Sequence, residues 1–329
     1  MPNIAILNEC NLRCPYCFAD DMIENQKTDT VHESQIMSVE TFVELLSFIN
    51  RDPVVDRIGI IGGEPTLHPD IKQILIETEA FCRQKNCICT VFTNGILLDN
   101  IIPFITRDLF HVLVNLNSPE IMGQKNFEKT INNLDLVYNC FGWKDKVNIG
   151  LNIFYEMDDY SFFYDTIKKF GIKTVRTSVV APTYKDHKKN KEDYYKKMKN
   201  KALNVYRNIH ESGAVVNLDC NRVPLCYFNA EEIQKLQEYT NNEYKHFFCS
   251  PVIDINPKLE AVRCFGVYNP VKIYDFNSID AIRRYFTIKQ DCVYIDKNRV
   301  QKCNKCKNFE SMACYGGCLS FSNKNEEII

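Results

Sequence analysis

The first half of the chain alternates short apolar runs with longer amphipathic segments. The apolar runs are rich in β-branched residues, which is the form expected of strands that are buried on both faces of a sheet. We expect six such strands, at residues 4–7, 57–61, 88–93, 111–116, 147–154 and 174–180.

Between these runs, apolar residues recur with helical spacing. Ser38 is expected to cap a helix whose apolar face includes Phe42 and Ile49, and Pro69 is expected at the first position of the next helix. Further helices are expected around residues 127–138 and 162–170, the second ended by Gly171. The alternation predicts a parallel α/β sheet, either open and doubly wound or a curved, incomplete barrel.

Residues 185–201 carry many lysines, and beneath them runs an apolar stripe formed by Tyr195, Met198, Ala202, Val205 and Ile209. This segment is expected to be a helix with a solvated outer face rather than a substrate-docking patch. After about residue 213 the helical periodicity weakens and cysteines become denser. The change predicts two domains, residues 1–212 and a smaller cysteine-rich domain at residues 213–329.

The composition narrows the class of protein. The chain has 329 residues, 16 of them cysteine, and a formal net charge of −2. A chain of this length buries a full-sized core without disulfides, and its charge gives no sign of a nucleic-acid-binding surface. No secretory signal or long apolar run is visible, so we expect a cytoplasmic protein with no membrane segment. Clustered cysteines in a reducing compartment predict metal ligands or catalytic thiols.

Three of these cysteines, Cys10, Cys14 and Cys17, follow the first expected strand within one short loop. Three is an odd number for disulfides and one short of a closed tetrahedral zinc site. Iron–sulfur clusters are held by cysteine thiolates, normally four. A cubane cluster held by only three cysteines leaves one iron open to another ligand.

A second motif, Gly62-Gly63-Glu64-Pro65, follows the second expected strand directly. Paired glycines let the backbone turn sharply and approach a ligand closely. Ligands of parallel α/β proteins bind at the carboxyl ends of the strands, which is where both motifs fall.

Together, the CxxxCxxC triplet, with Tyr16 before its last cysteine, and the later GGEP motif resemble the radical S-adenosylmethionine (radical SAM) superfamily. The resemblance implies a partial (β/α)6 TIM-like barrel and a [4Fe–4S] cluster whose open iron is chelated by S-adenosylmethionine (SAM). It also implies that the cluster donates an electron to cleave SAM, and that the resulting 5′-deoxyadenosyl radical abstracts hydrogen from the substrate. The alternative is a zinc-binding or redox cysteine loop on an unrelated α/β fold.

The same resemblance assigns the SAM contacts. It implies that backbone groups around Gly62, Gly63 and Glu64 bind the methionyl amino group, with Pro65 closing the motif. Three polar residues that follow or lie on later strands are also expected to contact SAM or shape the mouth of its cavity: Asn94, Ser118 and Asn152.

The tail carries Cys303, Cys306, Cys314 and Cys318, preceded by Cys249 and Cys264. In isolation these spacings also fit a zinc ribbon. After a radical SAM barrel they resemble the SPASM or twitch extension, which binds one or two auxiliary [4Fe–4S] clusters. The sequence departs from the family pattern, because seven residues instead of five separate Cys306 from Cys314 and no cysteine follows Cys318.

Six tail cysteines are two short of two complete cubanes, and Cys220 and Cys226 would raise the number to eight. Motif analogy places Cys226 in one set, with Cys249, Cys264 and Cys318. It places Cys303, Cys306 and Cys314 in the other set, whose fourth ligand is Cys220, Cys292 or a group other than cysteine.

Other candidate residues are expected to be structural. Cys82, Cys87, Cys89 and Cys140 fall on helix or strand patterns and are expected in the core. His68 is expected to be structural at a helix start. Asp219 is a candidate general base, although a solvated or capping carboxylate is the commoner role at a strand end. The catalytic residue stays unassigned.

SPASM-bearing radical SAM enzymes mostly modify peptides or proteins, by crosslinking or by oxidising a side chain, so the resemblance implies such a substrate. It also implies a reductant such as flavodoxin or ferredoxin. The first strand begins at residue 4, so a separate protein is expected wherever a leader peptide must be bound. The alternatives are a radical SAM oxidoreductase that acts on a small metabolite and a non-enzymatic α/β protein that binds zinc.

Overall fold

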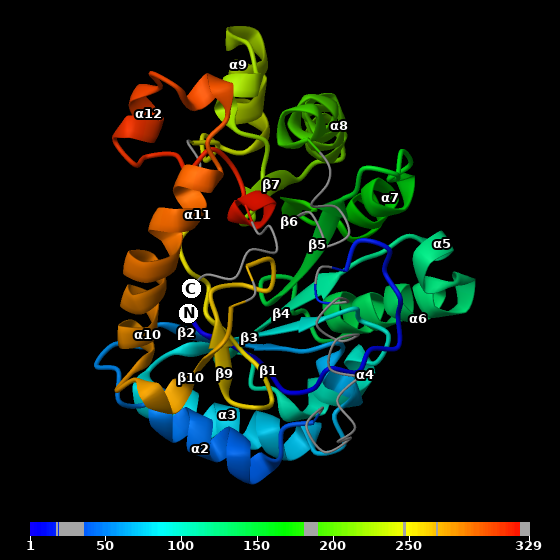
Figure 1. Ribbon diagram of the computed structural model, residues 1–329. Coiled ribbons are helices and arrows are strands. Elements are labelled where there is room, and N and C mark those ends of the chain that lie inside the picture. The colour runs from blue at the N-terminus through cyan, green and yellow to red at the C-terminus, as the bar shows by residue number, and fades with distance from the viewer. Residues whose placement is uncertain (18, 20–35, 181–189, 246–247, 268, 323–329) are drawn as a thin grey trace. The chain divides into compact units, whose positions relative to one another are not determined.

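The computed structural model describes residues 1–17, 19, 36–180, 190–245, 248–267 and 269–322 (Figure 1). Their contacts form two compact units. The first consists of Met1–Ile149 and Pro251–Thr287, and the second of Gly150–Ser250 and Ile288–Ile329. The domain boundary expected at residue 212 stays a prediction.

The first unit is built on parallel strands. These are β1 (Asn3–Ala5), β2 (Arg57–Ile61), β3 (Ile88–Thr93) and β4 (Phe110–Asn115), paired in that order. Two-residue β8 (Asp254–Ile255) pairs in parallel with β1, and β9 (Glu260–Val262) and β10 (Val271–Lys272) follow it antiparallel. The first four apolar runs therefore form strands as expected, whereas the three short strands were not predicted.

Amphipathic helices cover this sheet, and Figure 1 shows α2 and α3 against one face of β1 to β3. The Ser38 hydroxyl accepts a hydrogen bond from the Thr41 amide, as expected of a cap. The helices of this unit are α2 (Val39–Ile49), α3 (Ile71–Lys85), α4 (Leu98–Ile101), α5 (Pro119–Met122), α6 (Gln124–Asp135) and α10 (Ile279–Tyr285).

One helix start differs from the expectation. Pro69 was predicted at the first helical position, but α3 begins at Ile71 and Asp70 is its N-cap residue. The cause is the preceding turn, Pro65–Leu67, which delivers His68 into the core. The His68 ring accepts the Asp70 amide hydrogen at Nδ1 and donates from Nε2 to the Met37 carbonyl, so the structural role expected for this histidine is confirmed.

The second unit continues the parallel pattern with β5 (Val147–Ile153), β6 (Thr174–Val179) and β7 (Val215–Leu218), in that order. β5 begins in the sequence of the first unit. The helices are α7 (Ser161–Phe170), α8 (Lys191–Glu211), α9 (Ala230–Tyr239), α11 (Cys292–Lys297) and α12 (Lys307–Glu310). Gly171 ends α7 in a left-handed conformation with φ 62°, as expected.

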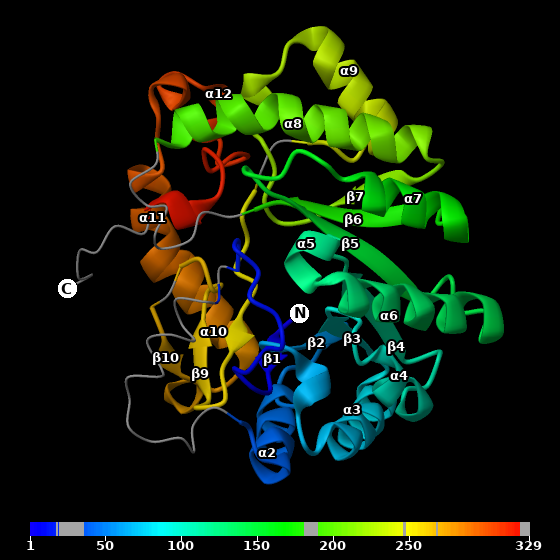
Figure 2. The same ribbon diagram turned by 90° about the vertical axis from the view of Figure 1, so that its right-hand side faces the viewer.

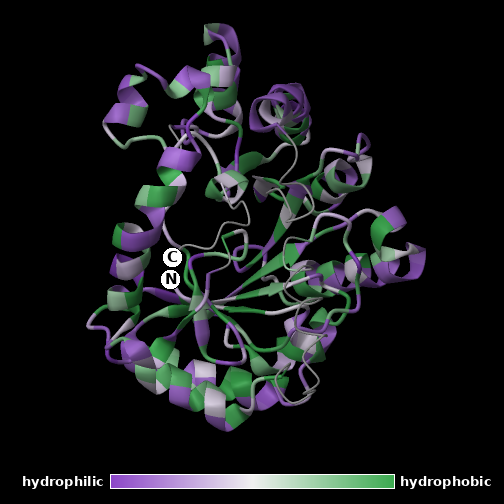
Figure 3. Ribbon diagram, in the orientation of Figure 1, coloured by the Kyte–Doolittle hydropathy of each residue, from purple (hydrophilic) through white to green (hydrophobic). Residues whose placement is uncertain are grey.

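The long helix α8 lies over β6 and β7 (Figure 2). All five residues of the predicted apolar stripe are buried, and Figure 3 shows the strands coloured mainly hydrophobic and α8 mainly hydrophilic on its outer side. The stripe is thus confirmed, while residues 185–189 of the lysine-rich segment lie outside the described residues.

Shorter helical turns complete the described structure. The 3₁₀ turns are Pro65–Leu67, Ile102–Phe104, Leu225–Tyr227, Ile273–Asp275, Gln301–Cys303 and Leu319–Ser322, and the π-helical turns are Leu136–Cys140 and Phe286–Asp291. No helix within the described ranges is both long and apolar enough to cross a membrane.

The cysteines expected in the core divide into two groups. Cys82, Cys87 and Cys89 are buried, as predicted. Cys140 is exposed, so its prediction was wrong. It lies at the last position of the Leu136–Cys140 turn, where the widened helix carries its side chain away from the core.

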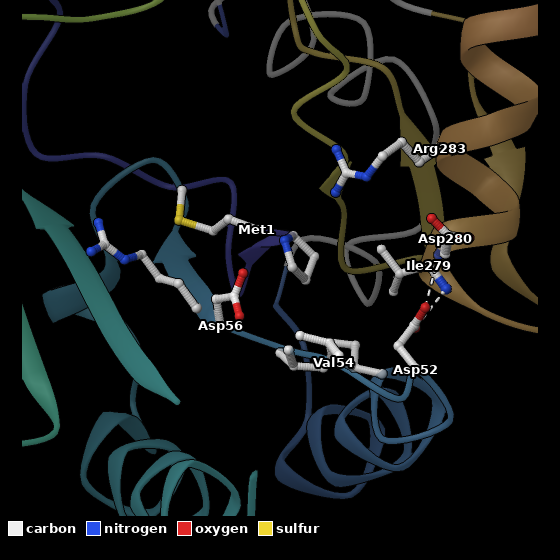
Figure 4. Close-up of a pocket in the computed structure, with 11 residues that line it drawn as sticks. Met1, Asp52, Val54, Asp56, Ile279, Asp280 and Arg283 are labelled. Atoms are coloured by element: carbon white, nitrogen blue, oxygen red, sulfur yellow. Dashed lines mark hydrogen bonds between the residues drawn. The ribbon is translucent and has the colours of Figure 1, made fainter. Parts of the chain in front are cut away.

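A pocket in the first unit lies at the amino-terminal ends of β1 and β2, lined in part by Met1, Asp56 and Arg283 (Figure 4). Beside it, buried Asp52 accepts the Ile279 and Asp280 amide hydrogens, each at 2.9 Å. This carboxylate satisfies two free N–H groups at the start of α10 and so fixes a helix more than 200 residues away in sequence.

We predict that Asp52→Ala lowers the free energy of unfolding by about 2 kcal/mol, because two amide hydrogens lose a charged acceptor. Urea denaturation followed by circular dichroism measures the change. Asp280→Asn is the matched control, since the Asp280 carboxylate is half-exposed and pairs with Arg284 within the helix; its effect should be about 0.5 kcal/mol. Equal losses in the two variants would contradict the capping role of Asp52.

Candidate functional site

The loop after β1 brings Cys10, Cys14 and Cys17 together. All three are half-buried. The pKa of the Cys14 thiol is raised to about 12, mainly by burial and to a smaller extent by the neighbouring Cys17 and Cys10. The Leu12 amide donates a hydrogen bond to Cys10 Sγ at 3.4 Å, which stabilises that sulfur as a thiolate. Neighbouring thiolates repel one another, so keeping all three cysteines ionised requires a positively charged partner.

A single metal ion and a cubane cluster place different demands on the spacing of three cysteines. Zinc binds sulfur at about 2.3 Å, so the ligands of one zinc ion lie about 4 Å apart. Among the residues that the structure describes, no three Cys, His, Asp or Glu side chains are grouped in this way. A cubane suits wider spacing, because each cysteine binds a different iron.

The two glycines of the GGEP motif pack against the strand that leads into this loop. A Cβ atom on Gly62 would lie 2.6 Å from the Leu7 carbonyl oxygen, and one on Gly63 would lie closer still to the Glu9 carbonyl. The Gly63 amide donates to Leu7 O at 2.9 Å, and the Glu64 amide to Glu9 O at 2.8 Å. Backbone hydrogen bonds therefore join the GGEP motif to the segment that leads into the cysteine loop, and only glycine fits where the two segments meet.

The Glu64 side chain is buried and joins two loops. Its carboxylate accepts hydrogen bonds from the Thr66 amide and hydroxyl, from the Thr93 hydroxyl at 2.7 Å and from the Asn94 amide at 2.7 Å. Burial raises the pKa of this carboxyl, and the hydrogen bonds from Thr66, Asn94 and Thr93 oppose the rise. Glu64 thus ties the end of β2 to the end of β3. Pro65, also buried, starts the turn that follows.

Asn94 continues this connection to the cysteine loop. Its Nδ2 donates to Asn11 Oδ1 at 2.7 Å, and its Oδ1 accepts the Ile96 amide hydrogen at 3.1 Å. Both ends of the side chain are therefore engaged within the protein. Sequence reasoning missed Asn11, although its place between Cys10 and Cys14 was a usable signal.

Ser118 has the opposite character. It is the N-cap residue of α5, yet its hydroxyl makes no capping bond. Ser118 Oγ and the neighbouring Asn117 Oδ1 are buried, and neither has a hydrogen-bond partner in the described part of the protein. Buried polar atoms normally find a partner. Two such atoms just after β4, at the same edge as the ends of β1 to β3, fit a polar ligand.

Two further candidates belong to the second unit. Asn152 lies on β5 in register with Ser178 of β6. Asp219 forms an ion pair with Arg176, and its Oδ1 accepts the Cys220 amide hydrogen at 2.6 Å. The Asp219 carboxylate is thus engaged in the way that the capping alternative expected.

One pocket of the second unit is lined by the three cysteines that motif analogy placed together and by one from the other set. Cys303, Cys306 and Cys314 line this pocket, and the fourth cysteine in its wall is Cys226. The pKa of Cys226 is raised to about 11, mainly by burial. The neighbouring Cys314, Cys303 and Cys306 act in the same direction, and Lys302 opposes them.

The remaining tail cysteines lie elsewhere. Cys220 and Cys292 are exposed, Cys249 is half-buried and Cys318 is buried, all in the second unit, whereas half-buried Cys264 belongs to the first unit. The assignment of Cys249, Cys264 and Cys318 to one ligand set stays a prediction.

Helix α8 supports the turn between Cys314 and Cys318. Lys191 Nζ donates to Asn298 Oδ1 at 2.8 Å, and Asn298 Nδ2 donates to the Tyr315 carbonyl at 2.6 Å and the Gly317 carbonyl at 3.1 Å. The Tyr195 hydroxyl accepts the Cys318 amide hydrogen at 2.9 Å. No pattern in the sequence pointed to these contacts, since Tyr195 and Cys318 are 123 residues apart.

We predict that Glu64→Gln lowers the free energy of unfolding by about 1–3 kcal/mol. The NH₂ group of the glutamine would face an N–H or O–H group that donates a hydrogen bond to the Glu64 carboxylate, so that hydrogen bond would be lost. Urea denaturation monitored by fluorescence tests this. Glu77→Gln is the control, since Glu77 on α3 is only partly buried and its carboxylate accepts a hydrogen bond from the Gln73 side chain; we expect a change below about 0.5 kcal/mol. A fully stable Glu64→Gln protein would refute the connecting role.

Curated relatives match parts of the chain. GTP 3′,8-cyclase of Rippkaea orientalis is 27% identical over 132 residues, which cover 40% of this chain and 37% of the relative. The same enzyme of Chlorobaculum tepidum is 35% identical over 97 residues, covering 29% of this chain and 26% of the relative. The matched part is thus well under half of either relative.

Solved structures match nearly all of the chain. The structure of anSMEcpe with bound AdoMet covers 98% of this chain and 91% of its own, with a TM-score of 0.63 and 19% identity. Streptococcus suis SuiB bound to S-adenosylmethionine covers 96% and 72%, with a TM-score of 0.61 and 15% identity. Other solved structures hold anSMEcpe with a Kp18Cys peptide and SuiB with its precursor peptide SuiA.

These likenesses confirm the expected α/β fold, with the parallel sheet typical of a partial barrel and a cysteine-rich C-terminal region. The family model of the radical SAM superfamily matches residues 4–188, which is more than half of the chain and includes the cysteine triplet and the GGEP motif. The chain belongs to the radical SAM superfamily.

Proposed function

We propose that this radical SAM enzyme modifies a peptide or protein, by forming a crosslink or by oxidising a side chain. The observation that carries the proposal is the extent of the structural likeness. anSMEcpe and SuiB, both solved with peptides, match 96% or more of this chain, including the cysteine-rich tail. The identity is at most 18% in those peptide complexes, so the likeness supports the substrate class through the fold alone.

The first ligand set suits a [4Fe–4S] cluster with one open iron. Cys10, Cys14 and Cys17 would hold three irons, which leaves the fourth for the amino and carboxylate groups of SAM. Such a cluster supplies the electron that cleaves SAM to the radical that abstracts hydrogen. The protein's part is to keep three thiolates together, and the Leu12 amide already donates to one of these sulfurs.

The protein groups around this loop divide into two roles. The Gly63 and Glu64 amides already bind Leu7 and Glu9, and the Glu64 and Pro65 carbonyls already accept from the Leu67 and His68 amides. The Gly62 and Gly63 carbonyls are therefore the proposed acceptors for the ammonium group of SAM. The unpartnered Ser118 hydroxyl is available to a polar part of SAM. Glu64, Pro65 and Asn94 are proposed to position the loops rather than to contact SAM. The side chains of Glu64 and Asn94 are already hydrogen-bonded within the protein, and Pro65 has no polar side-chain group. Asn152 remains a proposed contact from β5.

The C-terminal region, residues 213–329, is proposed to resemble a SPASM or twitch domain with one or two auxiliary [4Fe–4S] clusters. Its candidate ligands are Cys220, Cys226, Cys249, Cys264, Cys303, Cys306, Cys314 and Cys318. An auxiliary cluster gives the substrate radical an acceptor for its surplus electron. That role suits oxidative modification, because the substrate radical left by hydrogen abstraction must lose one electron to give a closed-shell product.

A second candidate function acts on a small molecule. The GTP 3′,8-cyclases favour it, because their identity to this chain reaches 35%, above that of the solved peptide-bound structures. The match covers only 29% of this chain and 26% of that cyclase, whereas the peptide-bound structures match 96% of this chain. GTP is therefore the discriminating small molecule to test.

The remaining partners follow from the chemistry. A flavodoxin or ferredoxin would deliver the electron, and a separate protein would present a leader peptide where one is needed. Because open-iron clusters are oxygen-labile, an anaerobic cytoplasm is the proposed setting.

The substrate class is tested with anaerobically reconstituted enzyme, SAM and a chemical reductant. Peptides encoded beside the gene are offered in one set of reactions and GTP in another, with a scrambled peptide as the control. We expect a matched peptide to stimulate 5′-deoxyadenosine formation at least about tenfold and to lose two hydrogens in mass per crosslink or oxidation. Stimulation by GTP together with its consumption would replace the peptide proposal.

The cluster assignment predicts that Cys14→Ala abolishes SAM cleavage and removes about four irons per chain, because a cubane held by two cysteines is lost. Quantification of 5′-deoxyadenosine and iron measures both. Cys140→Ala is the matched control, since Cys140 is exposed and far from the triplet in sequence; it should keep full iron and activity. Undiminished cleavage by Cys14→Ala would reject the assignment of the triplet.

A further inference from the structure

We propose that Cys226, Cys303, Cys306 and Cys314 together form the complete ligand set of one auxiliary [4Fe–4S] cluster. The inference rests on the proposed function, in which the tail binds auxiliary clusters, and it changes the set to which Cys226 belongs. It identifies the fourth ligand that the tail triplet lacks.

The first support is convergence on one pocket. Its wall includes Leu225–Tyr227, the turn that carries Cys226, and the segment around Cys303, Cys306 and Cys314. All of these residues lie within the second unit. Cys220 and Cys292, the other cysteines considered as the fourth ligand, are absent from the lining.

The second support is the backbone that presents the three tail sulfurs. Cys306 donates its amide hydrogen to Cys303 O at 3.1 Å, and Lys305 between them has φ 65°. Cys314 donates its amide hydrogen to Asn308 O at 2.9 Å, just after Met312 with φ 59°. Left-handed backbone costs a residue with a side chain about 1–2 kcal/mol. The chain accepts this strain twice within eight residues, and each strained position precedes a pocket cysteine.

The third support is a feature shared with the SAM-cluster loop. The Gly316 amide donates to Cys314 Sγ at 3.4 Å, as the Leu12 amide does to Cys10 Sγ at 3.4 Å. In both cases the donor lies two residues after the cysteine. Hydrogen bonds of this kind stabilise thiolates and tune cluster potentials. A Cβ on Gly316 would also lie 3.4 Å from Cys303 Sγ, so the glycine leaves that sulfur open to the pocket.

The fourth support is charge. A cubane with four thiolate ligands is an anion, and two lysines lie beside these sulfurs. Lys302 lines the pocket, donates to the Cys226 carbonyl at 3.4 Å and lies 4.3 Å above the Tyr227 ring. Lys191 interacts electrostatically with Cys303, Cys318 and Cys314, so its charge favours an anionic cluster here without separating Cys318 from the set. Cations beside a partly buried anion offset its desolvation.

Cys318 is left for a different set. It is not part of the pocket lining, its amide hydrogen goes to Tyr195, and its Sγ lies 2.9 Å from Ser320 Oγ. Cys226 and Cys318, which motif analogy placed on one cluster, are therefore assigned to different ones.

The test is the iron content of paired variants of the full chain after anaerobic reconstitution. Cys226→Ala and Cys303→Ala should each lose about four irons, and the double variant should still lose only about four, because both cysteines hold one cubane. Cys226→Ala with Cys318→Ala should lose about eight where both auxiliary clusters assemble. Cys292→Ala is the matched control that should lose none, because Cys292 is not part of the pocket lining.

Three outcomes overturn the inference. One is additive iron loss in the double variant of Cys226 and Cys303, another is full iron in Cys226→Ala, and the third is iron loss in the Cys292→Ala control. The same measurements separate a failure of this inference from a failure of the proposed function. A wild-type chain with only about four irons would show that the protein has no auxiliary clusters. The Cys226→Ala protein should still cleave SAM without substrate, because Cys10, Cys14 and Cys17 are unchanged.

Discussion

The close approach of two backbone segments is the constraint on which the SAM site depends. The Gly62-Gly63 segment lies against Leu7 and Glu9 so tightly that any side chain there would collide with a carbonyl group. Because Glu9 precedes the first cysteine of the triplet directly, this contact fixes where the cysteine loop leaves the sheet. It also sends Glu64 into the interior, where its buried carboxylate gathers donors from the end of β3. A buried charge with all its hydrogen bonds made is costly to move, so the loops hold one geometry.

Much of the parallel sheet could be predicted from the sequence, because strands buried on both faces must be apolar along their whole length. The six expected runs all became strands, each within about one residue of its expected start. β7 and the two-residue β8 were missed because they are too short to show periodicity, and their pairing depends on β6 and β1 as neighbours. Exposed Cys140 was missed because a π-helical turn shifts the helical phase that the prediction assumed.

Part of the candidate site could likewise be predicted from the sequence, and part could not. The triplet and the GGEP motif could be recognised because each is contiguous in sequence and follows a recognisable strand. The grouping of Cys226 with Cys303 could not, because 76 residues separate Cys226 from its neighbour Lys302 and the motif pattern supplied a different partner. The unpartnered Ser118 hydroxyl illustrates a third case, in which the residue was expected but only the structure shows that its capping bond is not made.

The support that α8 gives to the tail has a consequence for how such chains diverge. Directly or through Asn298, Lys191 and Tyr195 reach the turn around residues 315–318 only at main-chain carbonyl and amide groups. Main-chain contacts do not depend on which side chain the supported residue carries. Tyr195 also leaves no room for a side chain at Gly317. Selection for the shape of the tail therefore falls on the helix and on the two glycines of the turn, Gly316 and Gly317, both of which have positive φ.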